Sequence, residues 1–340
     1  MKAAAMTRFG PPSVLQVIEM PRPVPKPNEL LIRIEAAGLN RLDHYIREGG
    51  VNPDLAFPHI LGSDAVGIVE DAGDDVTGFK QGDRVIPMPG YPTDPSDAGA
   101  DVLASSKTYA IRGLIENGAY AEYMTIPAAW TLQAPEGLSS VDLATLPMPL
   151  VTAVQAVKKV GAVKAGDKVL IQAGASGTGS FMVQIAKALG AQVAATVRSE
   201  NKRDFVTSLG ADLVVSMDEN AMHLIADWSD GGVDVAIDNL GGPSLARSVD
   251  ATKPLGLTVL MGNVLGLESV LPVRSVFFPQ KRISGTLMGG VDDLEWGLQQ
   301  VLAGTIRPTR DKAFALDEAE AAHTRLASGD ALGNTVFEIS

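Results

Sequence analysis

Residues 169–193, VLIQAGASGTGSFMVQIAKALGAQV, decide the fold of this chain. The stretch begins with an apolar run typical of a buried strand and passes through a turn of small residues. It continues with apolar residues at helical spacing: Met182, Ile185, Ala186 and Leu189. Gly190 is placed to end the helix, and AQVAATV after it again has the composition of a strand. Strand, crossover helix and strand in this order predict two parallel strands of one sheet.

The alternation of strand and helix patterns continues from residue 130 to about 265. ENKRDFVTSLG predicts a helix, ADLVV a strand, and GVDVAIDNLGG and GLTVLMGNV two further strands. We therefore expect an α/β fold with a doubly wound parallel sheet. Residues 1–127 instead hold short runs bounded by Gly, Pro and Asp, which predict a β-rich region. Residues 88–118 predict a long loop that is either functional or poorly ordered.

The glycine turn has the composition of a dinucleotide-binding loop. Small residues let the backbone approach a pyrophosphate, and the following helix N-terminus offers unpaired N–H groups and a positive partial charge. Ser176 stands where the strict G-x-G-x-x-G pattern has its middle glycine. A tight turn that binds nothing is the alternative. We predict that the turn binds a pyrophosphate through Gly174, Ser176, Gly177, Thr178 and Gly179.

The end of the next strand indicates which dinucleotide is bound. NAD-binding units usually place an acidic residue about 20 residues after the glycines, where it holds the ribose hydroxyls. Here Thr196, Val197 and Arg198 occupy the candidate positions. A carboxylate would repel a 2′-phosphate, whereas cations and hydroxyl groups would bind it. A solvated start to the next helix is the alternative interpretation. The sequence predicts that NADP(H) is bound with the help of Arg198, Ser199, Lys202 and Arg203.

Composition narrows the classes of partner. The 340 residues include 40 acidic and 28 basic side chains, and the net charge of −12 argues against nucleic acid as a partner. No apolar run reaches membrane-spanning length and no signal peptide is recognisable, so we expect a cytoplasmic protein without membrane contact. The chain has no cysteine, which excludes disulfides and thiolate metal ligands. A small-molecule substrate is the expected partner.

Several long motifs resemble the medium-chain dehydrogenase/reductase superfamily, specifically its quinone oxidoreductase branch. They are HILGSDAVGIVEDAGDDVTGFKQGDRV, GAYAEYMTIP and the stretch quoted first, with AAGLNRLDHYIREG, VDVAIDNLGG and RISGTLMGG in agreement. The resemblance implies a GroES-like β-barrel domain at residues 1–127, a Rossmann NADP-binding domain at 128–266, and a C-terminal segment, 267–340, that returns to the first domain. It also implies a cleft between the two domains for nicotinamide and substrate, and assembly into homodimers or homotetramers.

The resemblance predicts no metal site. Zinc-dependent members place a Cys and a His where Asn40 and Ser63 stand, and the cysteines of a structural zinc lobe would fall within residues 88–118, which contain none. Without a metal, the charge that develops on the acceptor is stabilised by hydrogen bonds, each of roughly 3–4 kcal/mol in favourable sites. We therefore expect acceptors that delocalise this charge themselves, namely quinones and α,β-unsaturated carbonyl compounds.

The segment GLNRLDHY carries the candidate catalytic residues, which the resemblance places at the nicotinamide: Asn40, Asp43 and Tyr45. Asn40 and Tyr45 can donate hydrogen bonds, whereas an ionised Asp43 only accepts them and would orient its neighbours. Each could instead satisfy local backbone groups. Asp64 is expected to be structural or to orient a neighbour.

Family positions near the cofactor add four further candidates: Thr152, Gly262, Asn263 and Asn334. Thr152 could instead be a core residue of a helix, and the Gly–Asn pair an ordinary turn. Asn334 stands where many relatives have the dipeptide Gly-Lys. The loss of that lysine removes one possible cofactor contact of those relatives.

Three functions remain open at this point. The leading hypothesis is NADPH-dependent, zinc-free reduction of quinones or α,β-unsaturated carbonyls by direct hydride transfer. An alcohol dehydrogenase-like enzyme that has lost its zinc sites is the first alternative, and a non-catalytic NADPH-binding protein with a structural or regulatory role is the second. The retained GLNRLDHY segment favours catalysis.

Overall fold

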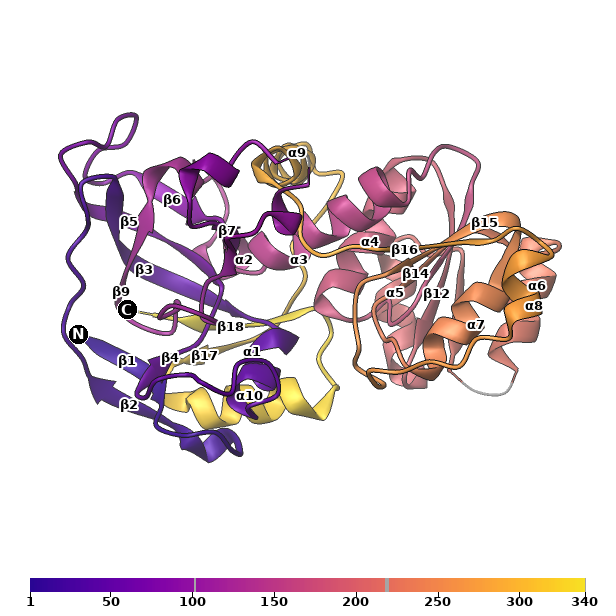
Figure 1. Cartoon of the computed structure of the whole chain (residues 1–340), viewed down its shortest axis with the longest axis horizontal. Coiled ribbons are helices and arrows are strands. Elements are labelled where there is room, and N and C mark those ends of the chain that lie inside the picture. The colour runs from indigo at the N-terminus through magenta and orange to yellow at the C-terminus, as the bar shows by residue number, and fades with distance from the viewer. Residues whose placement is uncertain (101, 218–219, 340) are drawn as a thin grey trace. The chain divides into compact units, whose positions relative to one another are not determined.

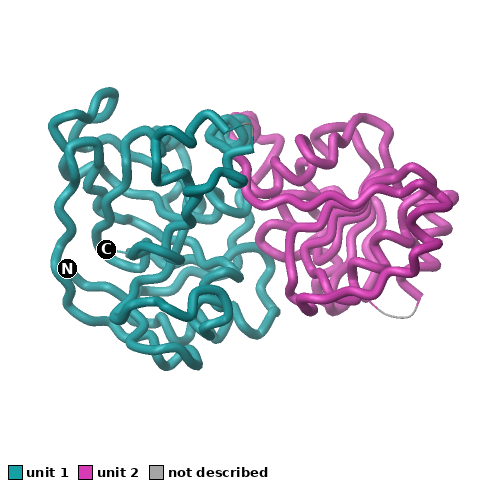
Figure 2. Tube along the Cα trace, in the orientation of Figure 1, with its two compact units in different colours: residues 1–149, 290–298, 308–340 teal, residues 150–289, 299–307 magenta. Residues whose placement is uncertain are grey.

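The computed structural model describes residues 1–100, 102–217 and 220–339, and the chain divides into two compact units (Figures 1 and 2). Unit 1 comprises Met1–Pro149, Gly290–Leu298 and Pro308–Ser340. Unit 2 comprises Leu150–Gly289 and Gln299–Arg307. This division differs from the boundaries expected after residues 127 and 266. Residues 267–289 lie in unit 2 because they supply the last strand of its sheet.

Unit 2 is built on a parallel sheet of six strands. In chain order they are β11 (Lys168–Ile171), β12 (Gln192–Val197), β13 (Leu213–Ser216), β14 (Val233–Asp238), β15 (Thr252–Leu260) and β16 (Arg282–Gly285). Their spatial order is β13-β12-β11-β14-β15-β16, and every pair is parallel. The direction of winding reverses between β11 and β14, as in a doubly wound nucleotide-binding fold. The predicted fold class is confirmed.

Helices connect the strands of unit 2, and the two that follow β11 and β12 lie where the sequence pattern predicts them. The right-handed rule for crossovers places α4 (Gly177–Ala188) and α5 (Arg203–Ser208) on one face of the sheet. It places α6 (Ala221–Ser229) and α7 (Pro243–Ala251) on the other face. The central strands are almost fully buried, because helices cover a parallel sheet on both sides. A short helix, α8 (Val273–Phe277), precedes the edge strand β16.

Unit 1 is β-rich. Its largest sheet has the order β10-β6-β5-β3-β18-β17, with β9 also paired to β3, and smaller sheets join β2-β1-β4 and β7-β8. The strands are β1 (Lys2–Met6), β2 (Leu15–Glu19), β3 (Glu29–Leu39), β4 (His59–Ile60), β5 (Asp64–Ala72), β6 (Arg84–Pro87), β7 (Gly90–Pro92), β8 (Tyr109–Ile111), β9 (Tyr123–Pro127), β10 (Thr131–Gln133), β17 (Arg310–Ala315) and β18 (Asn334–Glu338). Strands from both ends of the chain therefore share one sheet.

Among the described residues, the further α-helices are α1 (Arg41–Arg47), α2 (Ser140–Leu143), α3 (Pro147–Val154), α9 (Val291–Leu302) and α10 (Ala319–Ser328). The chain passes from unit 1 to unit 2 within α3. The region 88–118 holds the β7-β8 pair, and Tyr91 within it stacks on Trp130 with ring centroids 5.9 Å apart. Within the described ranges, no helix combines the length and apolar character needed to cross a membrane.

Candidate active site

The glycine turn after β11 is fastened to the end of β12. Ala173 has a φ of +51°, and its N–H donates to Oγ1 of Thr196 at 3.0 Å. The N–H of Gly174 donates to the carbonyl of the same threonine at 2.9 Å. A Cβ at Gly174 would lie 2.9 Å from the Cβ of Ala195. Glycine at this position therefore allows the turn to pack directly on the neighbouring strand.

The N-terminus of α4 has the properties of an anion site. Ser176 is the N-cap residue, and its Oγ accepts the N–H of Gly179 at 3.1 Å. A Cβ at Gly179 would lie 2.2 Å from the carbonyl oxygen of Ala173, so only glycine fits there. Among the described residues, none accepts a hydrogen bond from the N–H of Gly177 or Thr178. Unpaired first-turn amides at the positive end of a helix suit the oxygens of a pyrophosphate.

Asn239 is a functional candidate that sequence reasoning missed. It follows β14 directly, and its Nδ2 lies 3.4 Å from Oγ of Ser176. Its Oδ1 is buried and has no partner in the described part of the chain. A Cβ at Gly262 would lie 2.1 Å from the carbonyl oxygen of Asn239, so the ends of β14 and β15 pack closely. The sequence did hold a signal for Asn239: it is a polar residue directly after a buried strand, which places it at the carboxyl edge of the sheet.

A row of buried side chains links the carboxyl ends of three strands beneath the turn. Thr196 Oγ1 donates to Gln172 Oε1 at 2.8 Å, and Gln172 Nε2 donates to Ser248 Oγ at 3.0 Å. Ser248 Oγ then donates to Oδ2 of Asp238 at 2.7 Å. Asp238 Oδ1 accepts the N–H groups of Leu240 and Gly241. These hydrogen bonds hold the glycine turn in a fixed position relative to the end of β14.

The four residues predicted to select a 2′-phosphate are not equivalent. Arg198 is exposed directly after β12, and Ser199 Oγ donates to Asn201. Arg203 Nη2 donates to Oε2 of Glu200 at 3.0 Å, and Lys202 is only 5% exposed. The charge of Arg203 is thus partly balanced by Glu200, an acidic residue of the same loop.

The remaining cofactor candidates lie in both units. Thr152, in the part of α3 that belongs to unit 2, has a buried Oγ1 without a partner among the described residues. Asn263 is exposed in the segment that follows β15. Asn334 begins β18 in unit 1, and both its backbone N–H and its Nδ2 donate to the carbonyl of Thr309, at 2.8 and 3.4 Å.

In unit 1, two of the three catalytic candidates are joined by a hydrogen bond. Asn40 is the N-cap of α1, and its N–H donates to Oδ2 of Asp43 at 2.7 Å. Asp43 also accepts Oη of Tyr120 at 2.8 Å and the N–H of Gly62 at 3.1 Å. Asn40 Nδ2 donates to Oδ2 of Asp64 at 2.8 Å. The structure thus adds Tyr120 and Asp64 as partners of the predicted residues.

Burial changes the acidity of both carboxyl groups. Asp43 is fully buried, and this burial raises its pKa to about 6 against the opposing effect of its three hydrogen bonds. Burial likewise raises the pKa of Asp64 to about 8; bonds from Asn40 and Met148 oppose the rise, and the charge of Asp43 adds to it. Both pKa values therefore lie above that of an exposed aspartate.

The third candidate, Tyr45, lies in the body of α1. Its Oη is buried and has no hydrogen-bond partner in the described ranges. Burial raises the pKa of this phenol, so it stays protonated near neutral pH. A protonated hydroxyl group without a partner is available as a donor to a ligand.

Asn40 and Ser63, which the resemblance places where zinc-dependent members are expected to hold their metal, are both engaged in hydrogen bonds. Asn40 donates to Asp64, and Ser63 Oγ donates to the carbonyl of Arg112 at 2.7 Å. In the ranges that the structure describes, no three His, Asp or Glu side chains form a group that could hold a metal ion.

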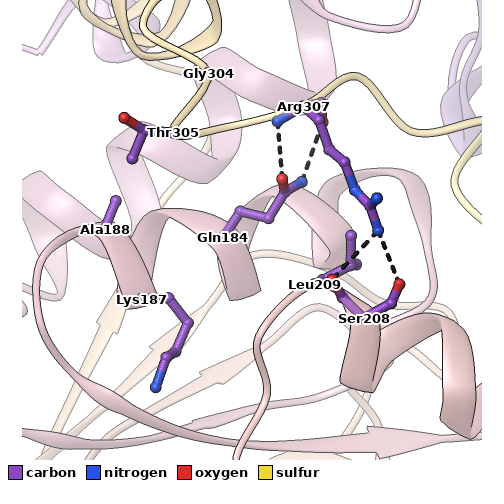
Figure 3. Close-up of a pocket in the computed structure, with 8 residues that line it drawn as sticks. All are labelled: Gln184, Lys187, Ala188, Ser208, Leu209, Gly304, Thr305 and Arg307. Carbon is purple, nitrogen blue, oxygen red and sulfur yellow. Dashed lines mark hydrogen bonds between the residues drawn. The ribbon is translucent and has the colours of Figure 1, made fainter.

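A surface pocket of about 410 Å³ lies elsewhere on unit 2 (Figure 3). It is lined by the second half of α4, the end of α5 and the segment that follows α9: Gln184, Lys187, Ala188, Ser208, Leu209, Gly304, Thr305 and Arg307. Gln184 Oε1 accepts the N–H of Arg307 at 2.9 Å, and Arg307 Nη2 donates to Oγ of Ser208 at 2.8 Å. The pocket shares no residue with the glycine turn, so it is distinct from the predicted dinucleotide site.

Comparison with known proteins gives consistent matches along the chain. Residues 26–136 match the alcohol dehydrogenase GroES-like domain, and residues 177–303 match the zinc-binding dehydrogenase family. A probable quinone oxidoreductase of Schizosaccharomyces pombe is 30% identical over 98% of this chain and 95% of its own length. A 2-haloacrylate reductase of Burkholderia is 29% identical over 98% of both chains. A solved structure described as an NAD-dependent alcohol dehydrogenase superimposes with a TM-score of 0.95 at 32% identity, covering both chains completely.

Proposed function

This chain belongs to the medium-chain dehydrogenase/reductase superfamily, and we propose that it uses NADPH to reduce quinones or α,β-unsaturated carbonyl compounds without a zinc ion. As a member of this superfamily it is an oxidoreductase that uses a nicotinamide cofactor and acts on a small molecule. Beyond this, we propose the preference for NADPH, the substrate class and the independence from zinc.

The N-terminus of α4 is the observation that carries the proposal. The unpaired N–H groups of Gly177 and Thr178 suit a pyrophosphate, and the orphaned Oδ1 of Asn239 and Oγ1 of Thr152 are buried acceptors that a bound ligand would satisfy. The residues present therefore fit a nicotinamide dinucleotide. When bound, this cofactor supplies the hydride.

The choice of NADPH over NADH rests on charge at the end of β12. Arg198 is exposed there, and no carboxylate occupies the positions that directly follow the strand. The carboxylate of Glu200 would disfavour a 2′-phosphate. It lies two residues after Arg198, however, and is paired with Arg203. A single charge-assisted contact from Arg198 to a 2′-phosphate would favour NADPH by about 1.5–3 kcal/mol. One structural relative is described as an NAD-dependent alcohol dehydrogenase, and titration with both nucleotides tests the preference of this chain.

The substrate class rests on the donors that unit 1 offers. Asn40 and Tyr45 can each donate one hydrogen bond, and neither Asn40 nor Ser63 is a residue type that commonly binds zinc. Hydrogen bonds of this kind suffice for an acceptor whose developing charge is spread by conjugation. Quinones and acrylate-type alkenes, after which two of the relatives are named, are acceptors of this type.

The proposal is tested by following NADPH oxidation with a benzoquinone and with cyclohexenone. We expect consumption with at least one of them, and we expect the rate to survive dialysis against a zinc chelator. Ethanol with NADP⁺ serves as the control and should give no reaction. Absence of consumption with every quinone and enone tried, or loss of activity on chelation with recovery on adding zinc, would show that the proposal is wrong.

We also propose that the protein forms homodimers or homotetramers through unit 2. Of the 18 large apolar side chains exposed in the described residues, ten lie between residues 255 and 287: Leu255, Val264, Leu265, Leu267, Val270, Val273, Phe277, Phe278, Ile283 and Leu287. These ten residues, named here the β16 surface, lie in the segment 255–287, which contains α8 and β16, and a standard interface buries about 800 Å² per partner. A second copy suits this surface because β16 is an edge strand, and two identical edges can pair around a twofold axis.

A further inference from the structure

We propose that Asp64 is a positioning residue, which sets the orientation of the Asn40 carboxamide towards the substrate by holding its Nδ2 atom. The inference rests on the proposed function, in which Asn40 donates a hydrogen bond to the acceptor. It assigns a role to a buried carboxyl group that does not itself touch the substrate.

The Asn40 side chain needs such a partner because its two ends are nearly equal in shape. A carboxamide can turn over, exchanging its NH₂ group and its oxygen, and only its hydrogen-bond partners decide which end faces which way. Asp64 Oδ2 lies 2.8 Å from Nδ2 and accepts from it. The contact commits one N–H to Asp64, which fixes the directions of the oxygen and of the second N–H.

Asp64 is itself held in place. Its Oδ1 accepts the N–H of Met148, in the first turn of α3, at 2.8 Å, and its side chain is almost fully buried. Gly38 lies opposite Asp64 in the register of β3 and β5. A Cβ at Gly38 would lie 3.1 Å from Oδ2 of Asp64 and 2.3 Å from the carbonyl oxygen of Ala144. The carboxyl group therefore has a defined place between β3 and α3.

The backbone of Asn40 is fixed independently by Asp43. Its N–H donates to Asp43, which is held in turn by Tyr120 and Gly62. The Tyr120 ring packs edge-on against Phe337, with centroids 4.8 Å apart. With the backbone held in this way, the remaining freedom of Asn40 is the rotation of its side chain, and Asp64 removes that freedom.

Replacement of Asp64 by Asn distinguishes a role in positioning the Asn40 side chain from a role in protein stability alone. The new side chain has the same shape and keeps an oxygen for Met148, but its NH₂ group then faces Nδ2 of Asn40. The Asn40 carboxamide must turn over to accept from it, which reverses the end that is offered to the substrate. The reciprocal double variant, N40D/D64N, restores an amide–carboxyl hydrogen bond with the two roles exchanged.

The experiment compares the wild type, D64N, N40D/D64N and the control D311N by unfolding and by steady-state kinetics. Asp311 is a buried acid of unit 1 that pairs with Arg325, so its replacement tests the loss of a structural carboxyl group. We expect D64N to lower kcat by roughly 10²-fold, the scale of a lost donor, and to change the KM for NADPH less than twofold. The double variant should recover stability but not kcat, whereas D311N should lose stability and keep kcat.

A failure of the inference about Asp64 can be distinguished from a failure of the proposed function. If the wild type reduces quinones or enones and D64N keeps its kcat, or if the double variant recovers kcat together with stability, Asp64 is merely structural and the inference is overturned. If the wild type reduces none of these acceptors, the proposed function fails and the role of Asp64 fails with it.

Discussion

His323 is a buried side chain that the fold does not satisfy. It is 0% exposed in α10, and both ring nitrogens lack a hydrogen-bond partner in the described part of the chain. Its ring meets Tyr120 edge-on at 5.8 Å. Burial lowers the pKa of His323 to about 3, and the nearby charges of Arg47 and His44 add to this effect.

The sign of the pH dependence follows from this lowered pKa. Between about pH 6.5 and pH 3 the unfolded chain binds a proton at His323 and the folded chain does not, so stability falls as the pH falls through this window. Asp43 and Asp64 act in the opposite direction. Their pKa values are raised on folding, so their contribution is present at low pH and is lost as the pH rises through about 6 and about 8.

Replacement of His323 by Leu should therefore stabilise the protein. The variant removes a buried group without partners, and we expect the free energy of unfolding to rise by about 1–3 kcal/mol at pH 7. The gain should be larger at pH 5, where the wild type also has to exclude a proton. Urea unfolding at both pH values measures it, with the exposed His223→Gln as control. An H323L variant less stable than the wild type at pH 5 would show that His323 has a partner after all.

At the scale of single elements, the sequence predicted the helices and strands whose own residues show a regular apolar pattern. The helix α4 has regular apolar spacing and a glycine directly after it, and the structure places it at Gly177–Ala188. The edge strand β16 was missed, because RISG has neither an apolar run nor a clean alternation. It forms a strand because β15 lies beside it, which is a tertiary effect. The domain boundary expected after residue 266 differs from the structure for the same reason.

The edge strand β16 gives a direct test of self-association, because the chain contains no cysteine. Single cysteines placed at each position of β16 (Arg282–Gly285) should yield, for at least one variant, a disulfide-linked dimer on mild oxidation. Two copies paired around a twofold axis bring one or two such positions within the distance of roughly 7 Å that a disulfide tolerates. A cysteine at Ser105 in unit 1 is the control and should stay unlinked.

A charged residue on the β16 surface tests the predicted self-association in a second way. Val270→Glu should shift the sedimentation-equilibrium mass towards the monomer, because it buries a carboxylate in the interface. Val24→Glu alters a similarly exposed valine of unit 1 and should leave the mass unchanged; Val270 is 89% exposed and Val24 is 84% exposed. A wild type that sediments as a monomer, or a V270E variant with an unaltered mass, would contradict the proposed interface.

At the scale of the whole molecule, the sequence predicted the fold class but not the side-chain network of the candidate site. The parallel sheet could be predicted because each strand and helix pattern is local. The contacts of Asn40 with Asp64 and of Asp43 with Tyr120 join residues 24 and 77 positions apart. Such contacts depend on strand register and on the packing of α1, neither of which a residue pattern determines. Tyr120 was overlooked for this reason, whereas Asn239 did carry a sequence signal, namely a polar residue directly after a buried strand.

Above all, we propose that the N-terminus of α4 binds a dinucleotide whose 2′-phosphate is recognised beside β12. Equilibrium titration of the purified protein with NADPH and with NADH, followed by nicotinamide fluorescence, tests this claim directly. We predict that NADPH binds at least about tenfold more tightly, a difference of about 1.4 kcal/mol, and that Arg198→Ala narrows the gap. Tighter binding of NADH, or binding of neither nucleotide, would contradict the claim.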